Sequence, residues 1–213
     1  MTSNDRTAGF FDGYAKGFDA IYGNENTLFN RFVNKAFRQV MRERFERTLA
    51  GCSPIEGKSV LDIGSGPGHY SIALARAGAK EVLGLDFAKG MLETAKKNAE
   101  AAGVGDKCTW EEGDFVLRKF DRKYDYAILM GFMDYMADPI AVVKKVGDVI
   151  NDRAFFSFPT DDGILAWQRK IRYKSRCDLY LYTRGHIDAI MKHTGKKFTI
   201  DSLGRDFFVT LYA

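Results

Sequence analysis

The sequence predicts an α/β protein with a single doubly wound, mostly parallel sheet of seven strands, closed by a C-terminal antiparallel hairpin and preceded by an N-terminal helical lid. Three observations predict this fold. The chain has 213 residues, a length that suits one hydrophobic core. After Pro54, short apolar segments alternate with helical segments, so the strands need crossover connections and run parallel. The last two strands are joined by only Gly204 and Arg205, which permits a hairpin and no crossover.

A long amphipathic helix is expected ahead of the sheet, over residues 26–50. Its apolar residues recur at steps of three and four, and Gly51 follows as a natural stop. Two interpretations are open: the helix packs on the sheet, or it belongs to a lid. We assign residues 1–52 to an N-terminal lid and substrate segment, and residues 53–213 to the main domain.

The alternating part of the chain predicts strands and helices in turn. Right-handed crossovers between parallel strands place the helices on both faces of the sheet. The expected strands cover residues 59–63, 81–85, 107–111, 124–130 and 153–158. The expected helices cover residues 69–77, 88–102 and 139–149.

The C-terminal part of the chain predicts the hairpin, from strands at residues 198–203 and 206–212. Between the fifth and sixth strands, residues 162–195 form an expected helical segment on the substrate side. His186 and His193 lie seven residues apart in this segment. Their pattern does not match the ligand spacing of a metal site, so no metal is expected.

The composition is that of a soluble globular protein and excludes several function classes. Lys and Arg number 32 against 28 Asp and Glu, an excess too small to indicate nucleic acid, although it permits an anionic small molecule. Cys52, Cys108 and Cys177 are odd in number and far apart, which fits a reducing compartment and neither a disulfide framework nor a zinc site. The N-terminus shows no signal-peptide pattern, and no apolar run reaches about 18 residues. We therefore expect a cytoplasmic protein without a membrane span; its oligomeric state stays open.

The chemistry is concentrated in a glycine-rich motif, VLDIGSGPGHY, at residues 60–70. A buried strand runs into three glycines and then into the start of a helix, so the backbone can turn sharply and its free N–H groups can meet an anion. A dinucleotide fingerprint needs a glycine where His69 stands. A phosphate loop would follow the strand, whereas Gly57-Lys58-Ser59 precedes it. A nicotinamide cofactor stays the alternative for this pocket.

The order of the motifs resembles the class I, Rossmann-like S-adenosylmethionine-dependent methyltransferases. Asp62, two places before the glycines, opens the first motif of that family, and Asp86 ends the second strand. Gly113-Asp114-Phe115 follows the third strand, and the segment YDYAILMG at residues 124–131 looks like the family's fourth strand. The terminal hairpin looks like the family's sheet closure, so the resemblance covers the chain from about residue 10 to residue 213.

The resemblance implies the cofactor S-adenosyl-L-methionine and a set of residues that bind it. In the family, the acid after the second strand holds the ribose hydroxyls, and the acid after the third strand binds the adenine amino group between aromatic side chains. Taken alone, Asp86 fits a cap of the next helix equally well. The end of the fourth strand supports the methionine moiety, and an N-terminal tyrosine closes over the cofactor. The implied cofactor-binding residues are Tyr14, Asp62, Gly64, Ser65, Gly66, Gly68, Asp86, Phe87, Met91, Gly113, Asp114, Phe115 and Met130.

The turn after the fourth strand predicts the acceptor chemistry. Methyltransferases of nucleobase amino groups usually carry Asn/Asp-Pro-Pro-Tyr/Phe here, whereas this chain carries GFMDYM at residues 131–136. Asp134 and Tyr135 are the candidate catalytic residues, which could deprotonate or hydrogen-bond an acceptor hydroxyl. A solvated loop carboxylate is the other interpretation of Asp134. We expect methyl transfer to a small molecule, at oxygen rather than nitrogen or carbon. The alternatives are an RNA or protein methyltransferase and a cofactor-binding module without methyl transfer.

Two further segments predict where the acceptor binds. The aromatic, glycine-punctuated residues 10–22 are similar to the family's lids, with Tyr22 behind the lid tyrosine. After the fifth strand, Trp167, Arg169 and Arg172 open a basic stretch that ends at Arg176. This stretch is either a solvated helix face or a patch that recognises carboxylate or phosphate on the acceptor. The outline is loosely similar to the O-methyltransferases of magnesium protoporphyrin, which esterify a propionate.

Overall fold

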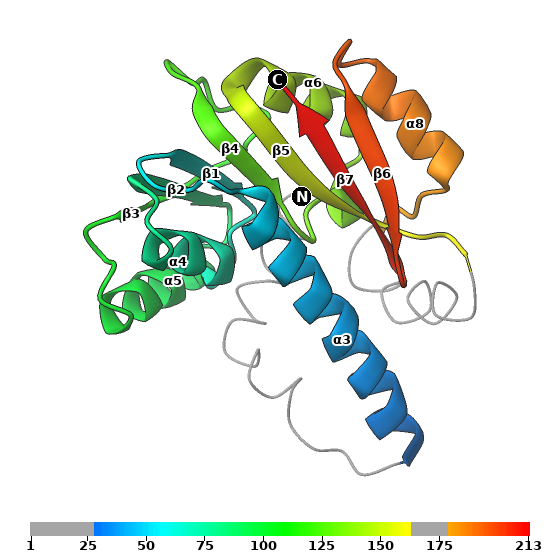
Figure 1. The fold of residues 1–213 in the computed structure, drawn as a ribbon, viewed down its shortest axis with the longest axis horizontal. Coiled ribbons are helices and arrows are strands. Elements are labelled where there is room, and N and C mark those ends of the chain that lie inside the picture. Colours follow the sequence, from blue (N-terminus) through cyan, green and yellow to red (C-terminus); the bar gives the residue numbers. More distant parts are fainter. Residues whose placement is uncertain (1–27, 163–178) are drawn as a thin grey trace.

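A seven-stranded sheet forms the centre of the computed structural model, which describes residues 28–162 and 179–213, with side chains from Gln39 onward. The strands lie in the order β3-β2-β1-β4-β5-β7-β6 (Figure 1). β1 to β5 run parallel, and β7 lies antiparallel between β5 and β6. This arrangement confirms the predicted fold class. The strands are β1 (Ser59–Ile63), β2 (Glu81–Asp86), β3 (Cys108–Glu112), β4 (Tyr124–Leu129), β5 (Ile150–Pro159), β6 (Phe198–Leu203) and β7 (Asp206–Tyr212).

Helices cover both faces of the sheet (Figure 1). One face carries α3 (Leu28–Gly51), α4 (His69–Arg76) and α5 (Lys89–Ala101), and the other carries α6 (Pro139–Val149) and α8 (Arg184–Lys192). The short helix η1 (Met133–Tyr135) follows β4. α8 is the helix found within the predicted segment 162–195, and it packs on α6 and β6. None of the helices in the described ranges combines the length and the apolar character that a bilayer crossing needs.

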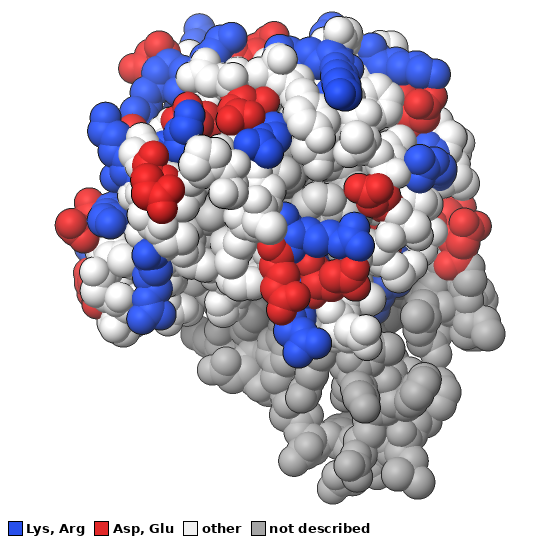
Figure 2. Space-filling model, in the orientation of Figure 1, with Lys and Arg blue, Asp and Glu red and all other residues white. Residues whose placement is uncertain are grey.

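The surface over α3 carries both signs of charge. Arg42 pairs with Glu46 at 3.7 Å and Arg47 pairs with Glu43 at 2.7 Å, each one helical turn apart. On the face drawn in Figure 2, the Lys and Arg side chains of the described residues are interspersed with Asp and Glu side chains. That face therefore does not present a broad basic surface in its described part.

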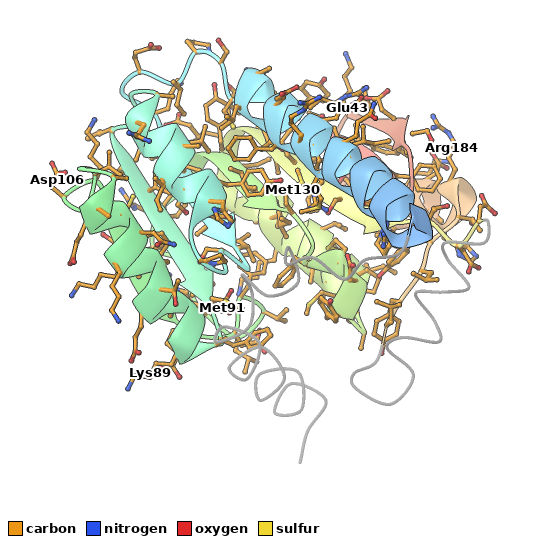
Figure 3. All side chains as sticks on the ribbon, turned by 90° about the horizontal axis from the view of Figure 1, so that it is seen from below. Glu43, Lys89, Met91, Asp106, Met130 and Arg184 are labelled. Atoms are coloured by element: carbon orange, nitrogen blue, oxygen red, sulfur yellow. The ribbon has the colours of Figure 1, made fainter. Side chains whose placement is uncertain are left out.

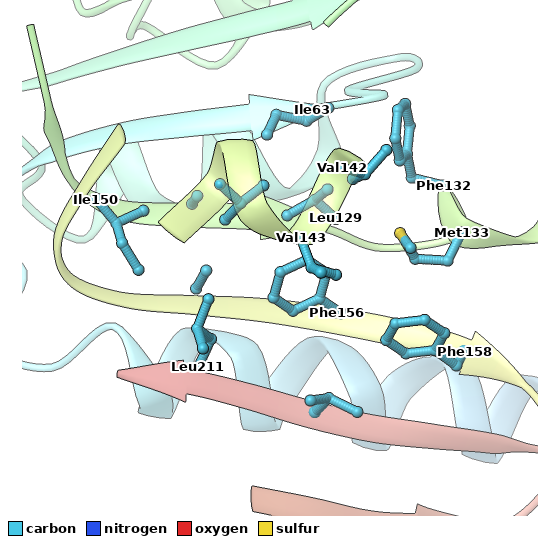
Figure 4. Packing of buried hydrophobic residues seen from close by; sticks show 14 of the residues in the cluster. Ile63, Leu129, Phe132, Met133, Val142, Val143, Ile150, Phe156, Phe158 and Leu211 are labelled. Atoms are coloured by element: carbon cyan, nitrogen blue, oxygen red, sulfur yellow. The ribbon is translucent and has the colours of Figure 1, made fainter. Parts of the chain in front are cut away.

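Alternation of side chains along the strands divides the apolar core into two layers. Val60 of β1 and Phe155 of β5 pack under α3, α4 and α5, which lie side by side in Figure 3. Their neighbours Leu61 and Phe156 point to the opposite face, where Val143 of α6 packs near Phe156 (Figure 4). A parallel sheet that is buried on both faces needs strands that are apolar at nearly every position, which is why these strands read as continuous apolar runs.

The start of β5 differs from the sequence prediction, whereas the other predicted elements end within two residues of the observed ones. β5 begins at Ile150, directly after α6, and not at residue 153. Tyr124 pairs with Ile150 but Tyr126 pairs with Arg153, so β5 carries one extra residue in a β-bulge. The polar residues Asn151 and Asp152 lie at this bulge and interrupt the apolar pattern that predicts a strand.

The helix expected ahead of the sheet is α3, and it packs on the sheet. A Cβ atom built on Gly51 would lie 2.5 Å from the Phe155 ring, and one built on Gly204 would lie 2.7 Å from Cγ2 of Val40. Both approaches require the absence of a side chain. The described part of the predicted lid segment 1–52 therefore packs closely on the sheet and on the turn of the hairpin.

The ring of Trp110 on the edge strand β3 fills a recess made by two glycines. A Cβ atom on Gly84 of β2 would lie 2.5 Å from Cε3 and Cζ3 of this ring, and one on Gly68 would lie 2.6 Å from Cη2. The indole therefore joins β2, β3 and the start of α4.

We predict that Gly84→Ala lowers the free energy of unfolding by about 1–3 kcal/mol, because the added methyl group overlaps the Trp110 ring. Gly147→Ala within α6 is the matched control: its Cβ would meet the flexible Lys196 side chain at 3.4 Å. Since alanine is the better helix former, we expect that variant to be as stable as the wild type or more so. Urea unfolding followed by circular dichroism measures both, and equal stability of Gly84→Ala and the wild type would contradict this packing.

Candidate active site

Two adjoining cavities open beyond the carboxyl ends of β1, β2 and β4, the edge where parallel sheets bind their ligands. Their volumes are about 210 and 190 Å³. The first, here named the β3-side cavity, extends to residues 113–117. The second, the α3-side cavity, extends to Met41 and Arg44. Both are lined by Gly64, Asp86, Phe87, Phe132, Tyr135 and Met136.

The glycine-rich turn between β1 and α4 lines the α3-side cavity, and its first residue, Gly64, lines both cavities. Gly64 and Gly66 adopt positive φ angles of 71° and 51°, which L side chains rarely adopt. A Cβ atom on Gly64 would also lie 2.8 Å from the Phe132 ring, whereas the corresponding position at Gly66 is open space. Gly64 is therefore needed for both conformation and packing, and Gly66 for conformation.

Asp86 joins this turn to the end of β2. Its Oδ2 accepts a hydrogen bond from the Gly66 backbone N–H at 2.8 Å, and its Oδ1 accepts one from the Ala88 N–H at 2.9 Å. The N-cap of α5 is Ala88, so Asp86 lies two residues before the cap position. The carboxylate lines both cavities with only 9% of the residue exposed. Asp86 thus supports the loop and borders the site.

Two residues of the motif that are predicted to bind the cofactor, Asp62 and Gly68, line neither of these two cavities. Asp62 is 2% exposed and accepts hydrogen bonds from the Ser71 N–H at 3.2 Å and the Ser71 Oγ at 2.6 Å. It therefore holds the first turn of α4. Gly68 is the N-cap of α4, and the Trp110 ring occupies the space beside it.

The β3-side cavity contains the predicted residues that follow β3. Gly113, Asp114 and Phe115 line it together with Phe87. Oδ1 of Asp114 accepts a hydrogen bond from the Val116 N–H at 2.7 Å, which fixes the turn. The buried Phe115 presents its ring to the cavity wall, as the resemblance implies for a residue beside an adenine ring.

Lys145 of α6 is a residue of this region that the sequence analysis missed. Its ammonium donates to the carbonyl oxygens of Val116 and Arg118, and it lies 5.2 Å from the centroid of the Phe115 ring. It anchors the turn from behind, outside the cavity. An isolated lysine on a helix gives no pattern from which this role could be predicted.

The α3-side cavity is bordered by two polar atoms without partners. Among the described residues, the buried side-chain nitrogen and oxygen atoms without a hydrogen-bond partner are Nε of Arg44 and Oγ of Ser65. Both residues line this cavity, and both are 6% exposed. Oγ of Ser65 lies 3.1 Å from a Cβ atom built on Gly84, on the side of β2. A buried polar group without a partner costs free energy, so Nε of Arg44 is the candidate contact for a polar ligand.

Arg44 is the second functional candidate that the sequence analysis missed. Its Nη1 donates to Ser157 Oγ at 3.3 Å and pairs with Asp206 Oδ2 at 3.4 Å. Burial opposes the charge, but Tyr70 and Asp206 outweigh it and raise the pKa of the guanidinium. The helical spacing could have revealed Arg44. This arginine lies four residues after Val40 and three after Met41, so it falls on the apolar stripe of the helix.

The two predicted catalytic residues occupy different positions. Tyr135 lines both cavities. Asp134 is 3% exposed and lines neither cavity, so it is not a solvated loop carboxylate. Its backbone oxygen accepts a hydrogen bond from the Tyr180 N–H at 2.8 Å. Tyr135 therefore stays the candidate that borders the site.

Of the remaining predicted residues, Met91 and Met130 line the α3-side cavity, from the start of α5 and the end of β4 (Figure 3). The predicted lid and acceptor residues Tyr14, Tyr22, Trp167, Arg169 and Arg172 lie outside the described residues.

Residues 60–153 match the family model described as a methyltransferase domain. The ubiquinone biosynthesis O-methyltransferases of Neisseria meningitidis serogroup C and Ruegeria pomeroyi are similar to this chain, with 31% and 34% identity over 115 residues. Each alignment covers 53% of this chain, and 48% and 44% of those enzymes. The chain therefore spans about half the length of the curated relatives it matches.

Solved structures of similar fold cover nearly the whole chain. The magnesium protoporphyrin IX methyltransferase of Synechocystis PCC 6803 with bound SAH has a TM-score of 0.72 and 24% identity, and covers 92% of this chain and 94% of its own. A DhpI–SAH complex has a TM-score of 0.70 and 17% identity, and the alignment covers 98% of this chain and 95% of the DhpI chain. At these identities the likeness establishes the fold. The matched domain, at residues 60–153, is the part of the chain that resembles known methyltransferases in sequence.

We predict that Asp62 stabilises the protein more at pH 5 than at pH 7, relative to an Asp62→Asn variant. Burial raises the pKa of Asp62 to about 6, against the two Ser71 hydrogen bonds, which lower it. Between about pH 4 and 6 the folded protein holds a proton that the unfolded chain has lost, so this contribution is lost as the pH rises through 6.

The expected change between pH 5 and 7 is about 1 kcal/mol, or a few degrees in Tm. Thermal unfolding of the wild type and Asp62→Asn at pH 5, 6 and 7 measures it. Asp106→Asn, which changes an exposed carboxylate, is the control. A difference between wild type and Asp62→Asn that stays constant with pH would show that Asp62 is not perturbed.

Proposed function

We propose that this chain, whose residues 60–153 form a methyltransferase domain, transfers a methyl group from S-adenosyl-L-methionine to an oxygen atom of a small-molecule acceptor. One observation carries the proposal. All six residues shared by the two cavities lie within that domain, at the glycine-rich turn, at the end of β2 and after β4. The family resemblance implies cofactor contacts from the same three places.

The β3-side cavity fits the nucleoside part of the cofactor. Phe87 and Phe115 give it apolar walls, and Asp114 lies at its border. Asp86 stands where the two cavities meet. A carboxylate offers about four acceptor sites, so Asp86 can hold the glycine-rich turn and also bind ribose hydroxyls.

The α3-side cavity fits the methionine part. The unpaired Nε of Arg44, a residue that lines this cavity, is suited to a carboxylate, because a guanidinium donates charge-assisted hydrogen bonds to it. The start of α4 borders the same cavity through Pro67 and His69. The arginine donor fits the carboxylate of S-adenosylmethionine.

S-Adenosylmethionine supplies a methyl group on a sulfonium, which is already activated toward a nucleophile. The chain mainly has to orient the acceptor where the two cavities meet, and orientation can supply roughly 7–11 kcal/mol of the barrier. Tyr135 lines both cavities, so we assign to its hydroxyl the role of binding or deprotonating the acceptor hydroxyl. Asp134 lies buried beside it and has no direct role in this proposal.

The lining of the α3-side cavity beside the methionine part of the cofactor favours an acceptor with an apolar body. Four methionines line it, and methionine side chains adapt to irregular apolar shapes. They are Met41, Met91, Met130 and Met136. Oxygen as the accepting atom is supported by the matched relatives, which are named O-methyltransferases.

Charge and cysteine chemistry support the rest of the proposal. The interspersed charges over α3 favour a small molecule over RNA (Figure 2). The proposal that the acceptor carries an anionic group is supported by Arg169 and Arg172 alone. Cys52 and Cys108 are free and buried, which suits a reducing cytoplasm.

We predict that Asp86→Ala weakens S-adenosylhomocysteine binding by roughly 10- to 150-fold, because lost charge-assisted hydrogen bonds cost about 1.5–3 kcal/mol. Isothermal titration measures the affinity, after circular dichroism has shown that the variant is folded. Asp106→Ala, an exposed carboxylate ahead of β3, should bind like the wild type. Tighter binding of NAD or NADP than of S-adenosylhomocysteine by the wild type would overturn the proposed function.

We also predict that Tyr135→Phe lowers methyl transfer by at least about tenfold, the loss expected when a proton acceptor or hydrogen bond is removed. Affinity for S-adenosylhomocysteine should stay within about twofold, because the ring is kept. The acceptor is first found by screening a metabolite extract for products heavier by CH2. Tyr212→Phe, at the end of β7, is the control. Turnover of Tyr135→Phe equal to that of the wild type would exclude the tyrosine from the reaction.

A further inference from the structure

Three distant segments of the chain meet behind the α3-side cavity. Arg44 comes from α3, Ser157 from β5 and Asp206 from β7. Nη1 of Arg44 lies 3.4 Å from Asp206 Oδ2 and 3.3 Å from Ser157 Oγ, which also accepts the Gly131 N–H at 2.8 Å. The cluster therefore links α3, the hairpin and the turn after β4.

The position of Asp206 is fixed by the sheet. It is the first residue of β7 and pairs with Pro159, the last residue of β5. The preceding turn is locked to α3, because Gly204 at φ +60° leaves space for Val40. Asp206 cannot follow Arg44 if the arginine moves, so it acts as a fixed anchor.

The burial of the Arg44–Asp206 pair makes it sensitive to the loss of either partner. The two side chains are 7% and 6% exposed. A buried charge that loses its partner is strongly unfavourable, so Arg44 without Asp206 would shift toward its other neighbours, Tyr70 and Asp134. Asp206 and Ser157 hold Nη1 of the planar guanidinium, while Nε has no partner, and Arg44 lines the α3-side cavity.

We infer that Asp206 is a positioning residue for the cofactor: through its ion pair it fixes the Arg44 guanidinium so that Nε receives the carboxylate of the bound methionine moiety. This inference rests on the proposed function. Asp206 does not touch the ligand. Its effect is transmitted through Arg44 and is confined to ligands that carry this carboxylate.

The test compares two ligands that differ in the amino-acid part. S-Adenosylhomocysteine carries the carboxylate, and 5′-methylthioadenosine keeps the nucleoside and lacks the amino-acid group. In Asp206→Asn, we expect the affinity for S-adenosylhomocysteine to fall at least tenfold and that for 5′-methylthioadenosine to stay within twofold. Asp201→Asn, an exposed carboxylate on the paired strand β6, is the matched control and should leave both unchanged.

A second variant, Asp206→Glu, keeps the charge and alters its position, so it guards against a folding failure of Asp206→Asn. We expect an intermediate loss for S-adenosylhomocysteine alone. In a double-mutant cycle with Arg44→Lys, the losses of affinity should be non-additive, because both substitutions disrupt the same Arg44–Asp206 contact. Circular dichroism and Tm of each variant establish that it is folded.

The outcomes separate this inference from the proposed function. If the wild type binds neither ligand, the proposed function fails. If the wild type binds both ligands equally well, or if Asp206→Asn weakens both by the same factor, the proposed function stands and the positioning role of Asp206 is overturned. A loss confined to S-adenosylhomocysteine supports it.

Discussion

The hydrogen bond from the Gly66 N–H to the Asp86 carboxylate, 2.8 Å long, is the contact on which both cavities depend. It joins the turn after β1 to the end of β2, and Gly64 and Asp86 line both cavities. The turn reaches the carboxylate because Gly64 and Gly66 adopt left-handed conformations. Residues with a Cβ at these positions would move the turn away from β2 and separate the two halves of the site.

The glycine-rich motif therefore combines two tasks that its sequence does not distinguish. Gly64 and Gly66 shape the cavity wall, whereas Gly68 makes room for Trp110. Asp62 holds α4 through Ser71 and stays out of the cavities. The half of the motif that faces away from the ligand keeps the other half rigid, and a rigid wall lowers the cost of binding because less freedom is lost.

Regular local patterns explain what could be predicted from the sequence. Helix 139–149 was predicted to the residue because Pro139 stands at its first position, behind the Asp138 cap that accepts from Ala141 N–H. The cofactor side of the site could be predicted because its motifs come in order at the ends of successive parallel strands. The apolar stripe of α3 points to Arg44 as a buried residue, but its partner Asp206 lies far away in the chain, so their ion pair arises from packing that no local pattern encodes. The burial of Asp134 also arises from packing.

The antiparallel direction of β7 explains how a residue near the C-terminus reaches a site built on parallel strands. β5 ends at the edge that carries the cavities, and its last residue, Pro159, pairs with Asp206 at the start of β7. A parallel strand beside β5 would begin at the opposite edge, about one strand length away. Because β7 runs the other way, its first residue lies at the same edge as the ends of β1 and β4: Leu129 at the end of β4 pairs with Phe156, and Asp206 pairs with Pro159, three residues farther along β5. The hairpin thus closes the sheet and also brings a carboxylate behind Arg44, which makes the sheet closure part of the site.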